Sequence, residues 1–239
     1  MKKIVLLIMI MVIGATAQSQ ILITLLLGDK LNQPGLEFGL EGGVNWSQIS
    51  GLDSKDFLTT FNMGFYFDIR LKNQLSLYTG VLVKANLGVD ELSDNDIKNL
   101  DETFFNYTDG TRVEGEYRHR MNYFLVPILF KYKFKNQIHI AAGPQVGLMY
   151  NSWIEFNSDV DGKEATIKDY NKDQINKIDA GIAVGLGYRL FKGTGWTISA
   201  KYYYGFVDVY KSISNTKNSS IFLEMCIPVG AATKTKKKK

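Results

Sequence analysis

The sequence predicts an all-β fold, an eight-stranded antiparallel up-and-down β-barrel that spans a membrane. Three observations lead to this prediction. Segments of about eleven residues alternate between apolar and polar positions, short turns alternate with long polar segments, and the triplet Lys-Asn-Gln occurs twice between alternating segments. A period of two places successive side chains on opposite faces of a strand. At ~3.3 Å per residue and a tilt of ~45°, such a strand crosses the ~25 Å apolar band of an outer-membrane barrel.

The first residues predict export. Two lysines precede an unbroken apolar run over residues 4–13, and an Ala-Thr-Ala sequence then provides the small residues of a cleavage site. This is the pattern of a secretory signal peptide. We therefore expect residues 1–17 to be removed and residues 18–35 to form an N-terminal periplasmic segment. An uncleaved anchor helix is the alternative, which the following Gln-Ser-Gln disfavours because it interrupts the apolar run.

The barrel is expected over residues 36–230, with a first strand over residues 36–47. The next segment, FNMGFYFDIRL (residues 61–71), places Phe, Met, Phe, Phe, Ile and Leu on one face and Asn, Gly, Tyr, Asp and Arg on the other. A second alternating segment, over residues 75–87, follows the first Lys-Asn-Gln triplet. The triplet therefore predicts the tight turn of a β-hairpin, in which Asn favours the turn conformation.

The remaining strands are predicted in the same way. The second triplet lies between residues 124–134 and 138–148, and a Lys-Gly-Thr-Gly turn joins residues 178–190 to residues 196–206. A last strand is expected near residues 221–229. The intervening polar segments are long, and they cover residues 88–118, 155–176 and 209–219, with a shorter one at residues 50–55. Short turns at one rim and long loops at the other are typical of outer-membrane barrels, with short periplasmic turns and long external loops.

The more polar face of the strands is expected to point into the lumen. In residues 179–189 it reads Asp, Gly, Ala, Gly, Gly and Arg, which suits an interior just wide enough to be filled by side chains. The inward charges have both signs, and a buried charge without a partner is costly. We therefore expect lumen ion pairs among Glu37, Glu41, Asp68, Arg70, Lys84, Lys131, Lys133, Asp179, Arg189, Lys201 and Glu224. A soluble lipocalin-like barrel with its apolar face inside is the alternative.

The charge, cysteine and histidine content of the chain limits which kinds of functional site it can form. The net charge is +4, but five lysines lie in the last seven residues, so the body of the chain is near balance and predicts no nucleic-acid groove. Residues 231–239 are expected to form a Lys-rich tail. The single cysteine, Cys226, excludes an internal disulfide. His119 and His139 are expected at opposite rims, so the sequence predicts no shared metal site, no catalytic residues and no cofactor.

Several strand segments resemble the PorT-like family of outer-membrane β-barrel proteins, over residues 36–229. They include GLEGGVNWSQI, MNYFLVPILFKYKF and DAGIAVGLGYRL, and the most distinctive element is Tyr-x-x-x-Pro at residues 123–127, followed by Ala-Gly-Pro at residues 142–144. The family takes its name from a member implicated in type IX protein secretion and gliding, and most relatives have no assigned role. Such barrels usually end their last strand with an aromatic residue, whereas this chain ends CIPVG before its Lys-rich tail.

These observations predict a non-enzymatic barrel in the outer membrane of a Gram-negative bacterium. It is expected to act through its external loops, above all residues 88–118, or through its periplasmic rim, in envelope organisation or linked to protein secretion. The expected partners are outer-membrane lipid and an envelope or secretion-machinery protein. The alternatives are a lipocalin-like ligand carrier and a small-solute channel. An enzyme would need a nucleophile–base pair, which the sequence does not show.

Overall fold

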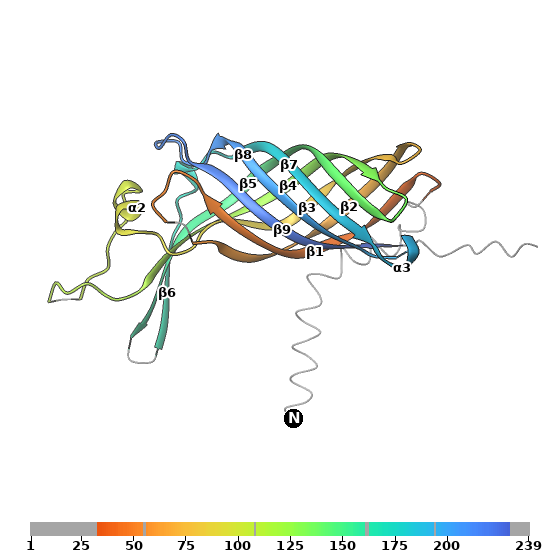
Figure 1. The fold of residues 1–239 in the computed structure, drawn as a ribbon. Helices are drawn as coiled ribbons and strands as arrows, with labels where there is room; N and C mark the ends of the chain where they lie inside the picture. Colours follow the sequence, from red (N-terminus) through yellow and green to blue (C-terminus); the bar gives the residue numbers. More distant parts are fainter. Residues whose placement is uncertain (1–32, 55, 108, 161–162, 194, 230–239) are drawn as a thin grey trace, which may run out of the picture.

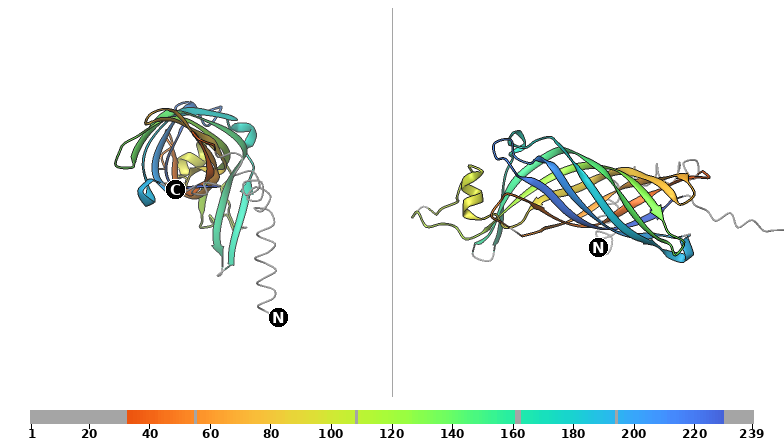
Figure 2. Two further views of the ribbon diagram at one scale, coloured as in Figure 1. Left: turned by 90° about the vertical axis from the view of Figure 1, so that its right-hand side faces the viewer. Right: turned by 45° about the horizontal axis from the view of Figure 1, so that its top comes forward.

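A computed structural model describes residues 33–229 apart from residues 55, 108, 161–162 and 194. The predicted signal peptide (residues 1–17), residues 18–32 of the predicted periplasmic segment and the Lys-rich tail (residues 231–239) lie outside the described residues. Eight antiparallel strands close into a ring, in which β9 pairs back with β1 (Figure 1). The ring consists of β1 (Leu36–Ile49), β2 (Leu58–Lys72), β3 (Leu75–Val89), β4 (Glu116–Lys133), β5 (Ile138–Val160), β7 (Ile178–Arg189), β8 (Thr197–Asp208) and β9 (Lys217–Pro228). The predicted barrel is thus confirmed, and the view along it shows the closed wall (Figure 2).

The outer surface of the ring is apolar. On β7, for example, Ile182, Val184 and Leu186 are exposed while the alternate positions Asp179 and Ala183 are buried. The same alternation holds on β8 and β9, where exposed Ile, Leu, Tyr and Met residues face outward. A soluble lipocalin-like barrel would carry its apolar set inside, so this alternative is wrong. None of the helices in the described segments is long and apolar enough to cross a membrane.

The two Lys-Asn-Gln triplets both form tight turns at the same rim, but the turns differ. In the first, Asn73 adopts the left-handed conformation with φ 51°, and β3 begins two residues later. In the second, Gln137 adopts it with φ 71°, and the Gln137 N–H donates to the Phe134 carbonyl. The second loop has the features of a three-residue hairpin, a turn followed by one left-handed residue. One sequence motif therefore serves the same rim through two backbone geometries.

A β-bulge in β3 changes which side chains point inward. The register between β3 and β4 shifts between Leu82 and Ala85, so that Leu82, Ala85 and Leu87 are all fully buried. Lys84 is paired with Met63, whose side chain is exposed, and Lys84 is itself exposed. The prediction of an inward Lys84 is therefore wrong, because a bulge inserts one extra residue and shifts the alternation.

Part of the predicted loop over residues 155–176 is instead a β-hairpin. Strand β5 continues to Val160, and β6 (Lys163–Asp169) pairs with it from Ile154↔Asp169 onward. This hairpin projects beyond the ring at the external end (Figure 1). The sequence of β6 does not predict a strand, because residues 164–169 are exposed to water on both faces and need no apolar alternation. Another predicted loop, over residues 88–118, contains the short helix α2 (Asp94–Asn99).

Candidate functional site

The interior of the barrel is divided into two halves of different chemistry. The external half is filled mainly by apolar side chains: residues from β3, β4 and β5 form one contiguous cluster with side chains from the external loops, and buried polar groups such as Asn45, Asn62 and Asp179 lie beside it. The cluster is centred on Leu82, Leu87, Val89, Ile97, Met121, Tyr123, Leu125, Met149 and Tyr210, all of which are at most 2% exposed. The periplasmic half holds the ion pairs of the lumen. Strand β4 shows the change along one face, from buried Met121 and Leu125 to the cationic Lys131.

Three pairs among the predicted lumen charges lie within ion-pair distance. Lys131 contacts Asp68. Arg189 Nη2 lies 2.5 Å from Glu37 Oε2, across the ring between β7 and β1. Lys201 Nζ lies 3.2 Å from Glu224 Oε1, and both side chains are less than 5% exposed. Lys201 also lies over the Phe222 ring, 4.7 Å from its centroid. Two of these pairs connect strands that are not consecutive in the sequence, β2 with β4 and β7 with β1, and the third connects the neighbours β8 and β9.

The other predicted lumen charges have different surroundings. The buried Glu41 accepts a short hydrogen bond from the Tyr78 hydroxyl. The buried Asp179 accepts from the Asn218 amide at 2.9 Å. Lys133 is half-buried and Arg70 is exposed, and among the described residues neither has a carboxylate within ion-pair distance. Lys84 lies outside the lumen, as described above.

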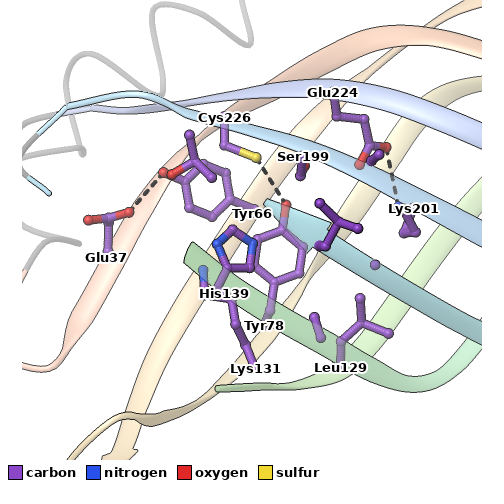
Figure 3. Close-up of a pocket in the computed structure, with 15 residues that line it drawn as sticks. Glu37, Tyr66, Tyr78, Leu129, Lys131, His139, Ser199, Lys201, Glu224 and Cys226 are labelled. Carbon is purple, nitrogen blue, oxygen red and sulfur yellow. Dashed lines mark hydrogen bonds and ion pairs between the residues drawn. The ribbon is translucent and has the colours of Figure 1, made fainter. Parts of the chain in front are cut away.

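A small cavity lies between the charged pairs, and a pair of stacked tyrosines lines it (Figure 3). The rings of Tyr66 and Tyr78 stack at 5.5 Å, and the Tyr66 hydroxyl donates to Glu37 Oε1 at 3.0 Å. The Tyr78 hydroxyl lies 3.5 Å from Cys226 Sγ. The cavity measures about 30 Å³, which is room for one or two waters. It is too small for an organic substrate.

A much larger cavity, the periplasmic vestibule, opens at the rim of the short turns. It measures about 860 Å³ and lies within the ring between the start of β1, the two Lys-Asn-Gln turns and the end of β7. The small cavity and the vestibule share Glu37, Lys131, His139 and Thr197 as lining residues, so the first lies directly behind the second. A Cβ on Gly187 would lie 2.4 Å from the His139 ring, so glycine is needed there to seat the histidine.

The external end is closed by folded loops. The Asp96 carboxylate, at the start of α2, accepts from the backbone N–H groups of Asp53 and Ser54 at 2.8 and 2.9 Å, which joins the first external loop to the second. His119 is fully buried and hydrogen-bonded with the Tyr210 hydroxyl at 2.6 Å and the Ser152 hydroxyl at 2.9 Å. These contacts connect β4, β5 and the last external loop.

The projecting β5–β6 hairpin also contacts this closed end. Glu155 accepts from Arg120 Nε at 2.8 Å and from the Trp153 indole at 3.0 Å. In the loop after α2, burial and the nearby Asp169 and Asp101 carboxylates raise the pKa of Glu102 to about 7. The hairpin and the second external loop are therefore coupled electrostatically.

The described residues hold no group of three or more His, Cys, Asp or Glu side chains arranged to bind a metal ion. His119 lies at the external end, hydrogen-bonded to Tyr210 of the last external loop. His139 lies at the periplasmic end, where it lines both cavities. Neither is near Cys226 in a nucleophile–base arrangement. Sequence reasoning missed both the apolar external half and the vestibule. The apolar residues on the inner face of β4 were the available signal for the first.

A ring of eight strands with an apolar outer surface and a charged interior defines an outer-membrane β-barrel protein. The chain belongs to the outer membrane protein beta-barrel domain family, which it matches over residues 17–211. It is a protein of the Gram-negative outer membrane, and its outer surface contacts lipid. This match does not distinguish PorT-like proteins from other members of the family.

Several solved structures are similar to the chain. Ail, the attachment invasion locus protein of Yersinia pestis, solved with the heparin analogue sucrose octasulfate, is 12% identical with a TM-score of 0.45, over 82% of this chain and 99% of Ail. Neisserial surface protein A is 9% identical with a TM-score of 0.40, over 81% and 97%. OprG of Pseudomonas aeruginosa is 10% identical with a TM-score of 0.31, over 82% and 95%. These TM-scores carry no functional argument. No curated protein sequence matches the chain.

The buried Lys201–Glu224 pair predicts a strong dependence of stability on both partners. Lys201→Met leaves the Glu224 carboxylate buried without its ammonium partner, and we expect a loss of about 3–5 kcal/mol in the free energy of unfolding. The double variant K201M/E224L removes both charges and should recover most of that loss. Urea unfolding in detergent micelles, followed by tryptophan fluorescence, measures both. A loss below about 1 kcal/mol for K201M would show that the pair does not stabilise the barrel.

The raised pKa of Glu102 predicts a pH-dependent loop. Because folding favours the protonated form, the folded loop binds more protons than the opened loop between about pH 4.5 and about pH 7. The free energy of loop opening should therefore fall as the pH rises through this window. Cleavage of residues 90–115 by a protease, normalised to an unstructured reference peptide, should accelerate with pH in the wild type and less in Glu102→Gln. An equal acceleration in both would assign the effect to other groups.

Proposed function

We propose that the protein is a non-conducting, non-enzymatic barrel that presents folded external loops to a partner at the cell surface. The observation that carries this proposal is the apolar filling of the external half of the lumen. It argues against transport, since a solute that entered the vestibule would meet a contiguous apolar cluster. The external loops are then the part of the chain that faces the medium.

The loops support this role because they are ordered by their own contacts. Asp96 joins two loops through backbone hydrogen bonds, and His119 joins a third to the wall. The aromatic rings of Tyr117 and Phe156 pack at 4.6 Å beneath the second loop. A surface that is already ordered loses less conformational freedom when a partner binds. The β5–β6 hairpin extends this surface beyond the ring.

The absence of enzymatic activity is supported by the surroundings of the reactive groups. Both ring nitrogens of His119 are hydrogen-bonded within a closed apolar environment. Cys226 is buried on β9 beside the Tyr78 hydroxyl, and no histidine is hydrogen-bonded to it among the described residues. A buried thiol without an activating base is inert.

Kinship with the PorT-like family is the finer part of the proposal, and the Tyr-x-x-x-Pro and Ala-Gly-Pro motifs support it. On this basis we infer a role beside a protein-secretion or envelope-organising complex, with the external loops or the periplasmic rim as the contact. Removal of residues 1–17 as a signal peptide, a periplasmic location for residues 18–35 and a separate Lys-rich tail at residues 231–239 belong to the same proposal.

Planar-bilayer recordings test the closed lumen. The purified full-length protein should insert without producing steady conductance steps, because the external half of the lumen is filled by side chains. A porin recorded in the same bilayer shows that insertion is detectable, and a heat-dependent gel shift shows that the sample is folded. Steady solute-sized steps from the folded protein would overturn the proposal in favour of the small-solute channel.

Photo-crosslinking in intact cells tests the contact surface. Tyr170, directly after β6, is 64% exposed, and Leu186, on the lipid-facing wall, is 60% exposed, so a photoreactive residue at each gives matched accessibility. We expect a discrete protein adduct from position 170 and none from position 186. Mass spectrometry should identify a partner that copurifies with the wild type and not with a folded variant lacking residues 157–168. If position 170 and other exposed loop positions give no protein adduct, the proposed surface contact is wrong.

A further inference from the structure

The periplasmic vestibule has an excess of positive charge that the barrel itself does not neutralise. Five basic and two acidic side chains line it, which leaves an excess of three positive charges. The basic residues are Arg70, Lys131, Lys133, Lys135 and Arg189, and the acidic residues are Glu37 and Asp68. The remaining lining residues are neutral apart from His139, which adds no negative charge.

The ion pairs account for only two of the five cations. Lys131 is paired with Asp68, and Arg189 is paired with Glu37. Arg70, Lys133 and Lys135 have no carboxylate within ion-pair distance in the described part of the chain. The unpaired charge at the periplasmic end of the lumen is therefore positive. Deeper in the barrel Lys201 pairs with Glu224, and the buried carboxylates Glu41 and Asp179 accept hydrogen bonds from Tyr78 and Asn218.

Unused hydrogen-bonding groups lie in the same wall. The Arg189 Nε is buried and has no hydrogen-bond acceptor within the described segments, although the Nη2 of the same guanidinium pairs with Glu37. A buried donor without an acceptor is costly, and a guanidinium group can donate two parallel hydrogen bonds to one carboxylate. The neutral side chains Asn73, Gln74 and Gln137 stand at the rim of the same cavity. Amides of this kind both donate to and accept from peptide groups.

The volume of the vestibule and its position within the ring indicate which kind of anion could bind there. At about 860 Å³ it is in the range of sites that hold organic ligands of substantial size, and is far larger than a single inorganic ion needs. It lies inside the ring, so a lipid headgroup would have to leave the leaflet to reach it. The chain's own tail is excluded by charge, because residues 236–239 are all lysine.

We propose that the vestibule binds an acidic peptide segment of a periplasmic protein. Carboxylates of the segment pair with Arg70, Lys133 and Lys135, and its backbone pairs with the rim amides. This interaction is separate from the external contact surface, since the apolar half of the lumen lies between them. The barrel would then have a partner on the periplasmic side whatever its external loops bind.

Fluorescence anisotropy of a labelled hexapeptide of alternating Asp and Gly, titrated with the full-length protein in detergent, tests the proposal. We expect binding that weakens with salt, and no binding of the matched Asn-Gly peptide. The double variant R70Q/K133Q should weaken binding about tenfold or more, since it removes two of the three unpaired cations. Within residues 33–229 as described, neither side chain has an ion-pair partner to lose, so the variant should keep the heat-dependent gel shift of a folded barrel.

The matched control is K72Q/K98Q, which removes the same charge from exposed residues outside the vestibule. It should change the affinity less than about twofold. The Lys-rich tail is identical in both variants, so its contribution cancels in the comparison. Equal weakening by the two variants, or no binding of the acidic peptide, would overturn the proposal. Displacement of the peptide by equimolar inorganic phosphate, or by phosphatidylglycerol in nanodiscs, would show that the site binds a small anion or a lipid. Either result would overturn the proposal that it binds a peptide.

Discussion

The narrow interior of an eight-stranded ring is the constraint on which the rest of the structure depends. Lipid covers the outside, so the wall must be apolar there, and the inward side chains must satisfy one another across a space that they fill themselves. A polar group placed inside without a partner is penalised twice, by lost hydration and by the lack of room for water. Each inward position therefore constrains positions on strands that are distant in the sequence.

The protein meets this constraint in two ways along one lumen. At the external end aliphatic and aromatic side chains pack into one cluster with the loops above them, and the buried Asp179 carboxylate there accepts a hydrogen bond from the Asn218 amide. At the periplasmic end it pairs opposite charges, as between Arg189 and Glu37, and stacks two tyrosines between the pairs. The first arrangement closes the barrel to solutes, and the second leaves an aqueous entrance with a net charge. The side chains that fill the lumen therefore give its two ends different functions.

Much of this could be predicted from the alternation of residues. Residues 61–71 and 178–190 predict strands with the correct inward and outward faces, because period two is a property of one strand alone. The position of Lys84 could not be predicted, since a bulge is defined by the register of two strands and leaves no mark on one. The β5–β6 hairpin could not be predicted because β6 is exposed to water on both faces, which removes its apolar alternation. The charges were predicted as a set, but the partner of each depends on the order of the ring.

The placement of the buried charges has a consequence for how the ring closes. The carboxylates Glu37 and Glu41 lie on the first strand and Glu224 lies on the last, whereas Lys201 and Arg189 lie on the two strands before the last. Neighbours β8 and β9 neutralise one pair by themselves, but Arg189 has its counter-ion only after the first strand has joined the last. An unclosed sheet therefore leaves this guanidinium at the periplasmic rim without its carboxylate. The gain of this ion pair favours the closed ring over an open sheet.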